Sequence, residues 1–168
     1  MKQASPELGS LLATASAQQA AGDSAAALWA YEQALPLLSG VEHLSDRARV
    51  LFQVAQLARF EGQIDRAYAC YDELLQLTAE LGDIRAHGLS VAMCGQLRFL
   101  QGERAEGIQA MIRGLDELRQ CGATEAEHLT CHTRFFSRRL PRPEFERCVR
   151  AATADVQLQE RLLRAGDA

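Results

Sequence analysis

Hydrophobic and polar residues alternate along the chain with the spacing of amphipathic helices. On either side of Gly62 the apolar residues recur every three or four positions, as Leu51, Val54, Ala55, Ala58, then Ile64, Ala67, Tyr68, Tyr71 and Leu74. This spacing places them on one face of a helix before the glycine and on one face of a second helix after it. Glycine suits the corner because a helix C-terminus often needs a left-handed residue, which glycine adopts without steric cost. The pattern therefore predicts a helical hairpin.

The same hairpin recurs every forty residues, since Gly22, Gly62 and Gly102 stand at equivalent places. Small residues recur seven positions before and five positions after each glycine, where two backbones would approach each other. These small residues are Ala15, Ala55, Gly95, Ala27, Ala67 and Gly107. Larger residues recur around them, at Leu11, Leu51, Val91, Leu35, Leu75, Leu115, Tyr31, Tyr71 and Met111. The chain is therefore expected to be a tandem array of hairpins.

This small–Gly–small–aromatic frame resembles the tetratricopeptide repeat (TPR) family, whose usual period is about 34 residues. The longer period resembles a variant in bacterial signalling and regulatory proteins, where segments like "AELGD" at 79–83 link successive hairpins. The resemblance implies an all-α fold, a right-handed α-solenoid of three clear TPR-like hairpins and a fourth degenerate one, with a C-terminal capping helix. It implies one domain over residues 1–168. The expected segments are approximately 8–40, 48–80 and 88–120, followed by the degenerate hairpin and cap at 124–165.

Three features depart from the repeat. In the third copy Gly95, Gly107 and Gly114 replace larger residues, which predicts either very close helix contact or a looser hairpin. Pro36 is expected to kink or shorten the second helix of the first hairpin. Near the C-terminus "LPRPEFERC" replaces the expected glycine, and its second proline, Pro143, is well placed to open a helix over about 143–164. That helix would close the open end of the stack.

Composition agrees with an all-helical protein that does not span a membrane. The chain is 48% hydrophobic and 24% charged, and it has no apolar run long enough to cross a bilayer. Without a basic start followed by an apolar run, the N-terminus does not resemble a signal peptide, so we expect a cytoplasmic protein. A glycine-rich phosphate loop, a nucleophile elbow and an obvious carboxylate pair are all missing, so we predict no enzyme activity and no cofactor.

The five cysteines have no disulfide-like or paired metal-ligand spacing. Cys70 and Cys94 fall on apolar helical faces, which favours free buried thiols. His128 and His132 would share a helix face, but Cys131 points elsewhere and no fourth ligand is evident. We therefore expect no metal site.

Charge is distributed unevenly. Residues 134–150 contain six arginines and two glutamates, a balance of +4, whereas residues 1–133 contain ten basic and seventeen acidic residues. The arginines, at 134, 138, 139, 142, 147 and 150, could form a patch for an acidic ligand, or they could pair with neighbouring helices and solvent. No basic motif interleaved with aromatic residues is present, so a nucleic-acid partner is not expected.

In the TPR family the first helices of the hairpins line a concave surface. Carried over by spacing from each glycine, the partner-binding residues implied here are Arg49, Phe52, Gln53, Gln56, Arg59, Leu89, Met93, Gln96, Phe99, His132, Phe136 and Arg139. Phe and Met can anchor apolar groups, and Gln and Arg can bond a peptide backbone or a carboxylate. The alternative for Phe52 and Phe99 is that they belong partly to the core.

These residues predict a protein-interaction scaffold, an adaptor or chaperone-like protein that binds a peptide or protein partner in a concave groove. One alternative is a regulatory module that docks an acidic ligand on the arginine-rich segment. Another is a self-associating structural protein, a homodimer formed through exposed apolar ends of the stack.

Overall fold

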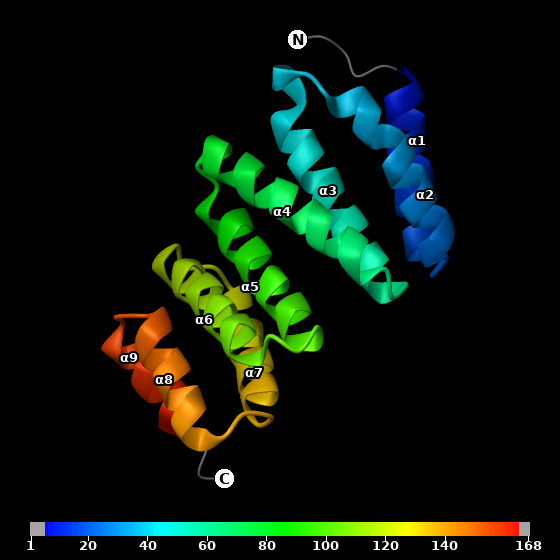
Figure 1. Ribbon diagram of the computed structural model, residues 1–168. Helices are drawn as coiled ribbons and strands as arrows, with labels where there is room; N and C mark the ends of the chain where they lie inside the picture. The colour runs from blue at the N-terminus through cyan, green and yellow to red at the C-terminus, as the bar shows by residue number, and fades with distance from the viewer. Residues whose placement is uncertain (1–5, 165–168) are drawn as a thin grey trace. The chain divides into compact units, whose positions relative to one another are not determined.

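The computed structural model describes residues 6–164, and in this range the chain forms helices and turns without any strand. The predicted all-α fold is confirmed. The helices, labelled in Figure 1, are α1 (Pro6–Ala20), α2 (Ser24–Ala34), α3 (Leu44–Phe60), α4 (Ile64–Leu81), α5 (Ile84–Leu100), α6 (Arg104–Gln120), α7 (Glu125–Ser137), α8 (Arg142–Ala152) and α9 (Val156–Arg164). Two short 3₁₀ helices, Leu35–Leu38 and Val41–His43, precede α3.

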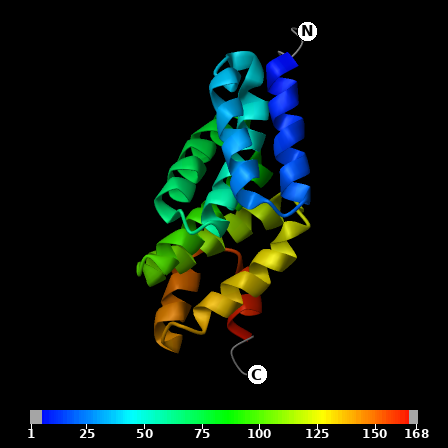
Figure 2. The same ribbon diagram turned by 90° about the vertical axis from the view of Figure 1, so that its right-hand side faces the viewer.

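The described chain divides into two compact units, unit 1 up to Leu81 and unit 2 from Gly82. Unit 1 contains the hairpins α1–α2 and α3–α4, and unit 2 contains α5 to α9. Figure 2 shows α1 and α2 running side by side. The expectation of one continuous domain stays a prediction.

The glycine corners have the conformation that the sequence predicts. Gly62 lies between α3 and α4 with φ of 75°, in the left-handed region that L side chains rarely adopt. Its N–H donates to the carbonyl of Arg59 at 3.1 Å, and the N–H of Gln63 donates to the carbonyl of Ala58 at 2.8 Å. These two bonds satisfy carbonyls that the end of α3 would otherwise leave unpaired. Gly22 and Gly102 also have positive φ, so the predicted corners are confirmed.

The small residues of the repeat lie in the core of unit 1. Full burial is common to Ala15 and Ala27 in the first hairpin and to Ala55 and Ala67 at the same places in the second. Tyr71 of α4 is also fully buried. Pro36 shortens the first hairpin as predicted, since α2 has 11 residues and α4 has 18. The chain continues from α2 as a 3₁₀ turn that contains the proline.

In unit 2 the glycines bring α5 and α6 into very close contact. Of the two predicted alternatives, close helix contact is therefore correct and a looser hairpin is not. A Cβ placed on Gly107 would lie 2.6 Å from the carbonyl oxygen of Gly95, and a Cβ on Gly95 would lie 2.6 Å from the carbonyl oxygen of Gly107. Gly114 packs in the same way against the backbone of Gly88 and Ala92. The helices are therefore closer than alanine would allow.

The C-terminal prediction is partly wrong. Pro143 lies in the first turn of α8 as expected, but the predicted helix over 143–164 is broken into α8 and α9. Thr153 has extended backbone angles, φ −144° and ψ 142°, and Asp155 begins the next helix by accepting hydrogen bonds from the N–H groups of Gln157 and Leu158. The break lets both short helices bury apolar side chains in the core of unit 2, at Phe145, Cys148, Val149, Leu158 and Leu162. The expected capping role is therefore shared by two helices.

Candidate functional site

Five of the predicted binding residues lie on α3, the first helix of the second hairpin in unit 1. Arg49 is exposed and pairs with Asp46 at 2.8 Å on the same helix. Phe52 is half-buried and meets Tyr71 edge to face, with ring centroids 6.1 Å apart. The alternative that Phe52 belongs partly to the core is thus correct for one side of its ring. The rest of that side chain stays accessible to a partner.

Gln53 ties α3 to α1. Its side-chain carbonyl accepts a hydrogen bond from the amide of Gln19 at 3.0 Å, and Gln19 in turn accepts one from the hydroxyl of Tyr31 at 3.2 Å. Gln56 and Arg59 follow one and two turns later on the same face and are half-buried. We name the face formed by Phe52, Gln53, Gln56 and Arg59 the α3 face.

In unit 2 the predicted residues of α5 are largely used by the core. Gln96 and Phe99 are only 7% and 5% exposed, and Leu89 and Met93 are half-buried against the same core. The ring of Phe99 meets Phe136 of α7 edge to face, with centroids 5.0 Å apart. The alternative that Phe99 belongs to the core is correct, and Phe136, at 6% exposed, joins it there.

The remaining predicted residues of unit 2, His132 on α7 and Arg139 in the turn after it, are exposed. The guanidinium of Arg139 lies over the ring of Phe135, 4.8 Å from its centroid, and 5.8 Å from that of Phe136. Phe135 is 53% exposed and is absent from the predicted set. Helical phase could have identified it, because positions 128, 132 and 135 fall on one side of α7.

The six arginines of residues 134–150 do not act as one patch. Arg134 donates to the backbone carbonyl of Arg161 at 2.9 Å, and Arg142 donates to that of Leu163 at 2.8 Å and pairs with Glu146. Both arginines thus bond backbone carbonyls in the C-terminal turn of α9. Within the described chain the exposed arginines at 138, 139, 147 and 150 make no ion pair. Some of the six arginines therefore pair with neighbouring helices, and the others remain available to an acidic ligand or to solvent.

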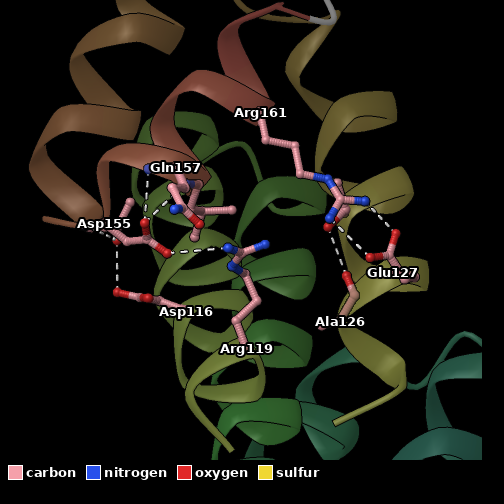
Figure 3. Close-up of polar contacts among 10 residues, drawn as sticks. Asp116, Arg119, Ala126, Glu127, Asp155, Gln157 and Arg161 are labelled. Carbon is pink, nitrogen blue, oxygen red and sulfur yellow. Dashed lines mark hydrogen bonds and ion pairs between the residues drawn. The ribbon is translucent and has the colours of Figure 1, made fainter. Parts of the chain in front are cut away.

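A polar network joins α6 to the break between α8 and α9 (Figure 3). The hydroxyl of Thr153 donates to the carboxylate of Asp116 at 2.7 Å and accepts from the N–H of Asp155 at 3.0 Å. Arg119 reaches the Asp155 carboxylate at 3.4 Å. Because Thr153 is buried, this network fixes where α8 ends and α9 begins.

Both acidic residues at the start of α7 are held by arginines from other helices. Arg85 of α5 bonds Glu125 and lowers the pKa of that carboxyl to about 2. Arg161 of α9 bonds Glu127, as Figure 3 shows, and lowers its pKa as well. Another pair, His87 and Glu117, joins α5 to α6 at 2.6 Å. Arg85 and Arg161 thus neutralise the two carboxylates of α7, Glu125 and Glu127.

The five cysteines are free thiols. Cys94 and Cys148 are buried and Cys70 is half-buried, and burial raises the pKa of Cys70 and Cys148. Cys121 and Cys131 are exposed. Among residues 6–164, no three His, Cys, Asp or Glu side chains gather where a metal ion could bind. Nor does this range contain a helix with the length and apolar character needed to cross a bilayer.

No family model matches the chain, and no curated protein matches it. Among solved structures, the crystal structure of the apo form of RapI is similar to it, with a TM-score of 0.76 and 11% sequence identity. The similarity covers 99% of this chain and 59% of the RapI chain, so this chain spans less than two thirds of that protein's length. At this identity the likeness shows the fold alone. The fold is an all-α solenoid of helical hairpins.

Proposed function

We propose that this protein is a non-catalytic scaffold of the long-period TPR type, an adaptor or chaperone-like protein that holds a polypeptide partner on the first helices of its hairpins. The observation that carries the proposal is the α3 face. Phe52, Gln56 and Arg59 are neither committed to the core nor fully solvated. They are therefore the side chains of unit 1 best able to contact a partner.

The chemistry of the α3 face suits an extended or helical peptide. The accessible side of Phe52 can anchor one apolar side chain, since aromatic residues contribute most to interface energy. Within the described chain the Gln56 amide makes no hydrogen bond, so its donor and acceptor can both pair with a peptide backbone. Arg59 is half-buried on the same face, and a guanidinium can donate two hydrogen bonds to a carbonyl or carboxylate of a bound peptide.

Neighbouring positions on α1 leave space for a ligand. By the forty-residue shift, Gly9, Ala13 and Ser16 correspond to Arg49, Gln53 and Gln56, and all three are small and exposed. Small residues beside larger ones on α3 would let a peptide backbone approach α1 closely while its side chains contact α3. In unit 2 the exposed residues His132 and Arg139 stay predicted binding residues.

Site-specific photocrosslinking in cells of the native host tests this proposal. A benzophenone amino acid replaces Gln56 on the α3 face or Gln76 on α4. Gln76 is exposed and, like Gln56, lies in a helix and makes no hydrogen bond within the described chain. We expect a discrete crosslinked protein from position 56 and none from position 76.

A second readout uses two triple-alanine variants of that same protein, one at Phe52, Gln56 and Arg59 and one at the exposed α4 positions 72, 76 and 80. After circular dichroism shows that both are folded, only the first should lose the crosslinked partner's affinity. Equal crosslinking from positions 56 and 76, or equal affinity of the two variants, would show that the α3 face is not the binding site.

A further inference from the structure

We propose that the outward side of α7, with the turn that follows it, is a second docking surface that recognises an acidic segment carrying an apolar side chain. The surface consists of His128, His132, Phe135, Arg138 and Arg139, which we name the α7 face. The inference deepens the proposed function, because it rests on the protein binding polypeptides and assigns a chemical class to what this face binds.

Helix geometry places most of the α7 face in one stripe. Residues 128, 132 and 135 of α7 are spaced by four and three positions, so their side chains leave the helix axis in nearly the same direction. Arg138 and Arg139 follow directly after Ser137, the last residue of α7, and the guanidinium of Arg139 lies over the ring of Phe135. All five residues are exposed, whereas the opposite side of α7 is buried at Ala126, Leu129, Thr130 and Thr133. The stripe is thus a continuous surface that the core does not use.

The charge of this surface is positive and unopposed. Both acidic residues of α7 are engaged, Glu125 by Arg85 and Glu127 by Arg161. Arg138 and Arg139 make no ion pair within the described chain. The α7 face therefore lacks a free carboxylate of its own, and a partner that brings carboxylates would find guanidinium groups without competing ones.

The stacking of Arg139 on Phe135 is the most specific feature. With its guanidinium 4.8 Å from the ring centroid, Arg139 is held by a cation–π contact and not by a carboxylate. A guanidinium over a ring keeps its N–H donors available for two-point bonding to a carboxylate. The exposed edge of Phe135 lies beside it for an apolar side chain. Arginine and aromatic residues together are the composition of interface hot spots.

Selection from a random dodecapeptide library displayed on phage tests the inference. Against the wild-type protein we expect enrichment of acidic peptides that contain Phe, Leu or Met. The key comparison is between Arg138→Ala/Arg139→Ala and Arg147→Ala/Arg150→Ala, since both remove two exposed arginines and the same net charge. Affinity for a selected peptide should fall about tenfold or more in the first variant and less than about twofold in the second.

The contribution of the ring is tested in the same way. Phe135→Ala should also weaken the peptide by about tenfold, whereas Phe60→Ala, which removes an equally large ring that is 77% exposed in unit 1, should not. Circular dichroism confirms that each variant is folded. The triple-alanine variant of the α3 face should keep full affinity for these peptides, so failure of the α7 face is distinguishable from failure of the α3 face.

Four outcomes would overturn the inference. Enriched peptides could be neutral or basic, or no peptide could be enriched at all. The matched arginine pairs could weaken binding equally, which would mean that net charge and not this surface attracts the ligand. A twenty-nucleotide single-stranded DNA could bind more tightly than the selected peptides and depend on the same two arginines, which would assign the surface to nucleic acid.

Discussion

Replacing Gly107 with alanine tests the close packing of α5 against α6. The new Cβ would lie 2.6 Å from the carbonyl oxygen of Gly95, 2.7 Å from the backbone nitrogen of Phe99 and 2.9 Å from the Cβ of Phe99. Two of these atoms belong to the backbone and cannot rotate aside. The methyl group can therefore be accommodated only if the two helices move apart.

Two effects of opposite sign set the magnitude. Alanine is a better helix former than glycine, which alone would stabilise the protein by about 0.8–1.0 kcal/mol. Inserting a methyl group into a tightly packed contact costs about 1–3 kcal/mol, and here the cost belongs at the upper end because backbone atoms are hit. We expect Gly107→Ala to lower the free energy of unfolding by about 1–2 kcal/mol.

Gly9 provides the matched control. It also lies inside a helix, α1, but a Cβ added there would meet no atom within 4 Å. Gly9→Ala should therefore show only the gain in helix propensity and stabilise the protein by up to about 1 kcal/mol. Urea unfolding followed by far-UV circular dichroism measures both variants, and the decisive result is the difference in sign.

A second glycine replacement strengthens the test. Gly95 and Gly107 meet at the same helix crossing, so one separation of the helices accommodates both methyl groups. The double variant Gly95→Ala/Gly107→Ala should consequently be less destabilised than the sum of the single variants. If Gly107→Ala proved as stable as the wild type, or more stable, the reasoning about α5 and α6 would be wrong.

Three further predictions concern an ion pair, a buried hydrogen bond and the five thiols. Arg85 lowers the pKa of Glu125 from 4.5 to about 2. The ion pair therefore stabilises the folded protein, by at most about 1 kcal/mol, above pH 4.5, and this stability is lost as the pH falls toward 2. Glu125→Gln should remove that acid-dependent loss in urea titrations, and an unchanged pH profile would refute the assignment. Thr153→Val should cost about 1–3 kcal/mol of unfolding free energy because the buried hydrogen bond to Asp116 is lost, whereas Thr14→Val at an exposed helical position should change little. Ellman's reagent should titrate two thiols quickly in the folded protein and all five after unfolding, and rapid reaction of more than two would contradict the observed burial.

The hairpins could be predicted from the sequence because their determinants are local. A glycine between two amphipathic runs needs only its own left-handed backbone to make a corner, as Gly62 shows. The small residues Ala55 and Ala67 stand at matching distances from the glycine and are both fully buried. Pro36 likewise shortens α2 through its own ring and its missing N–H.

The break between α8 and α9 could not be predicted, because it depends on a contact distant in sequence. The segment around Thr153 contains several alanines, which are compatible with an uninterrupted helix. What fixes the break is the bond from Thr153 to Asp116, 37 positions away on α6. The burial of Phe99 was undetermined for the same reason, since its partner Phe136 belongs to another helix.

The glycines of unit 2 link the fold to the proposed α7 face. Gly107 stands where the second hairpin has Ala67, and the missing methyl group leaves room for the backbone and Cβ of Phe99. Phe99 then contacts Phe136, which supports Phe135 with ring centroids 5.5 Å apart. Phe135 and Phe136 together position Arg139. A methyl group at position 107 should thus disturb peptide binding at α7 as well as stability, although residue 107 lies on another helix and is itself buried.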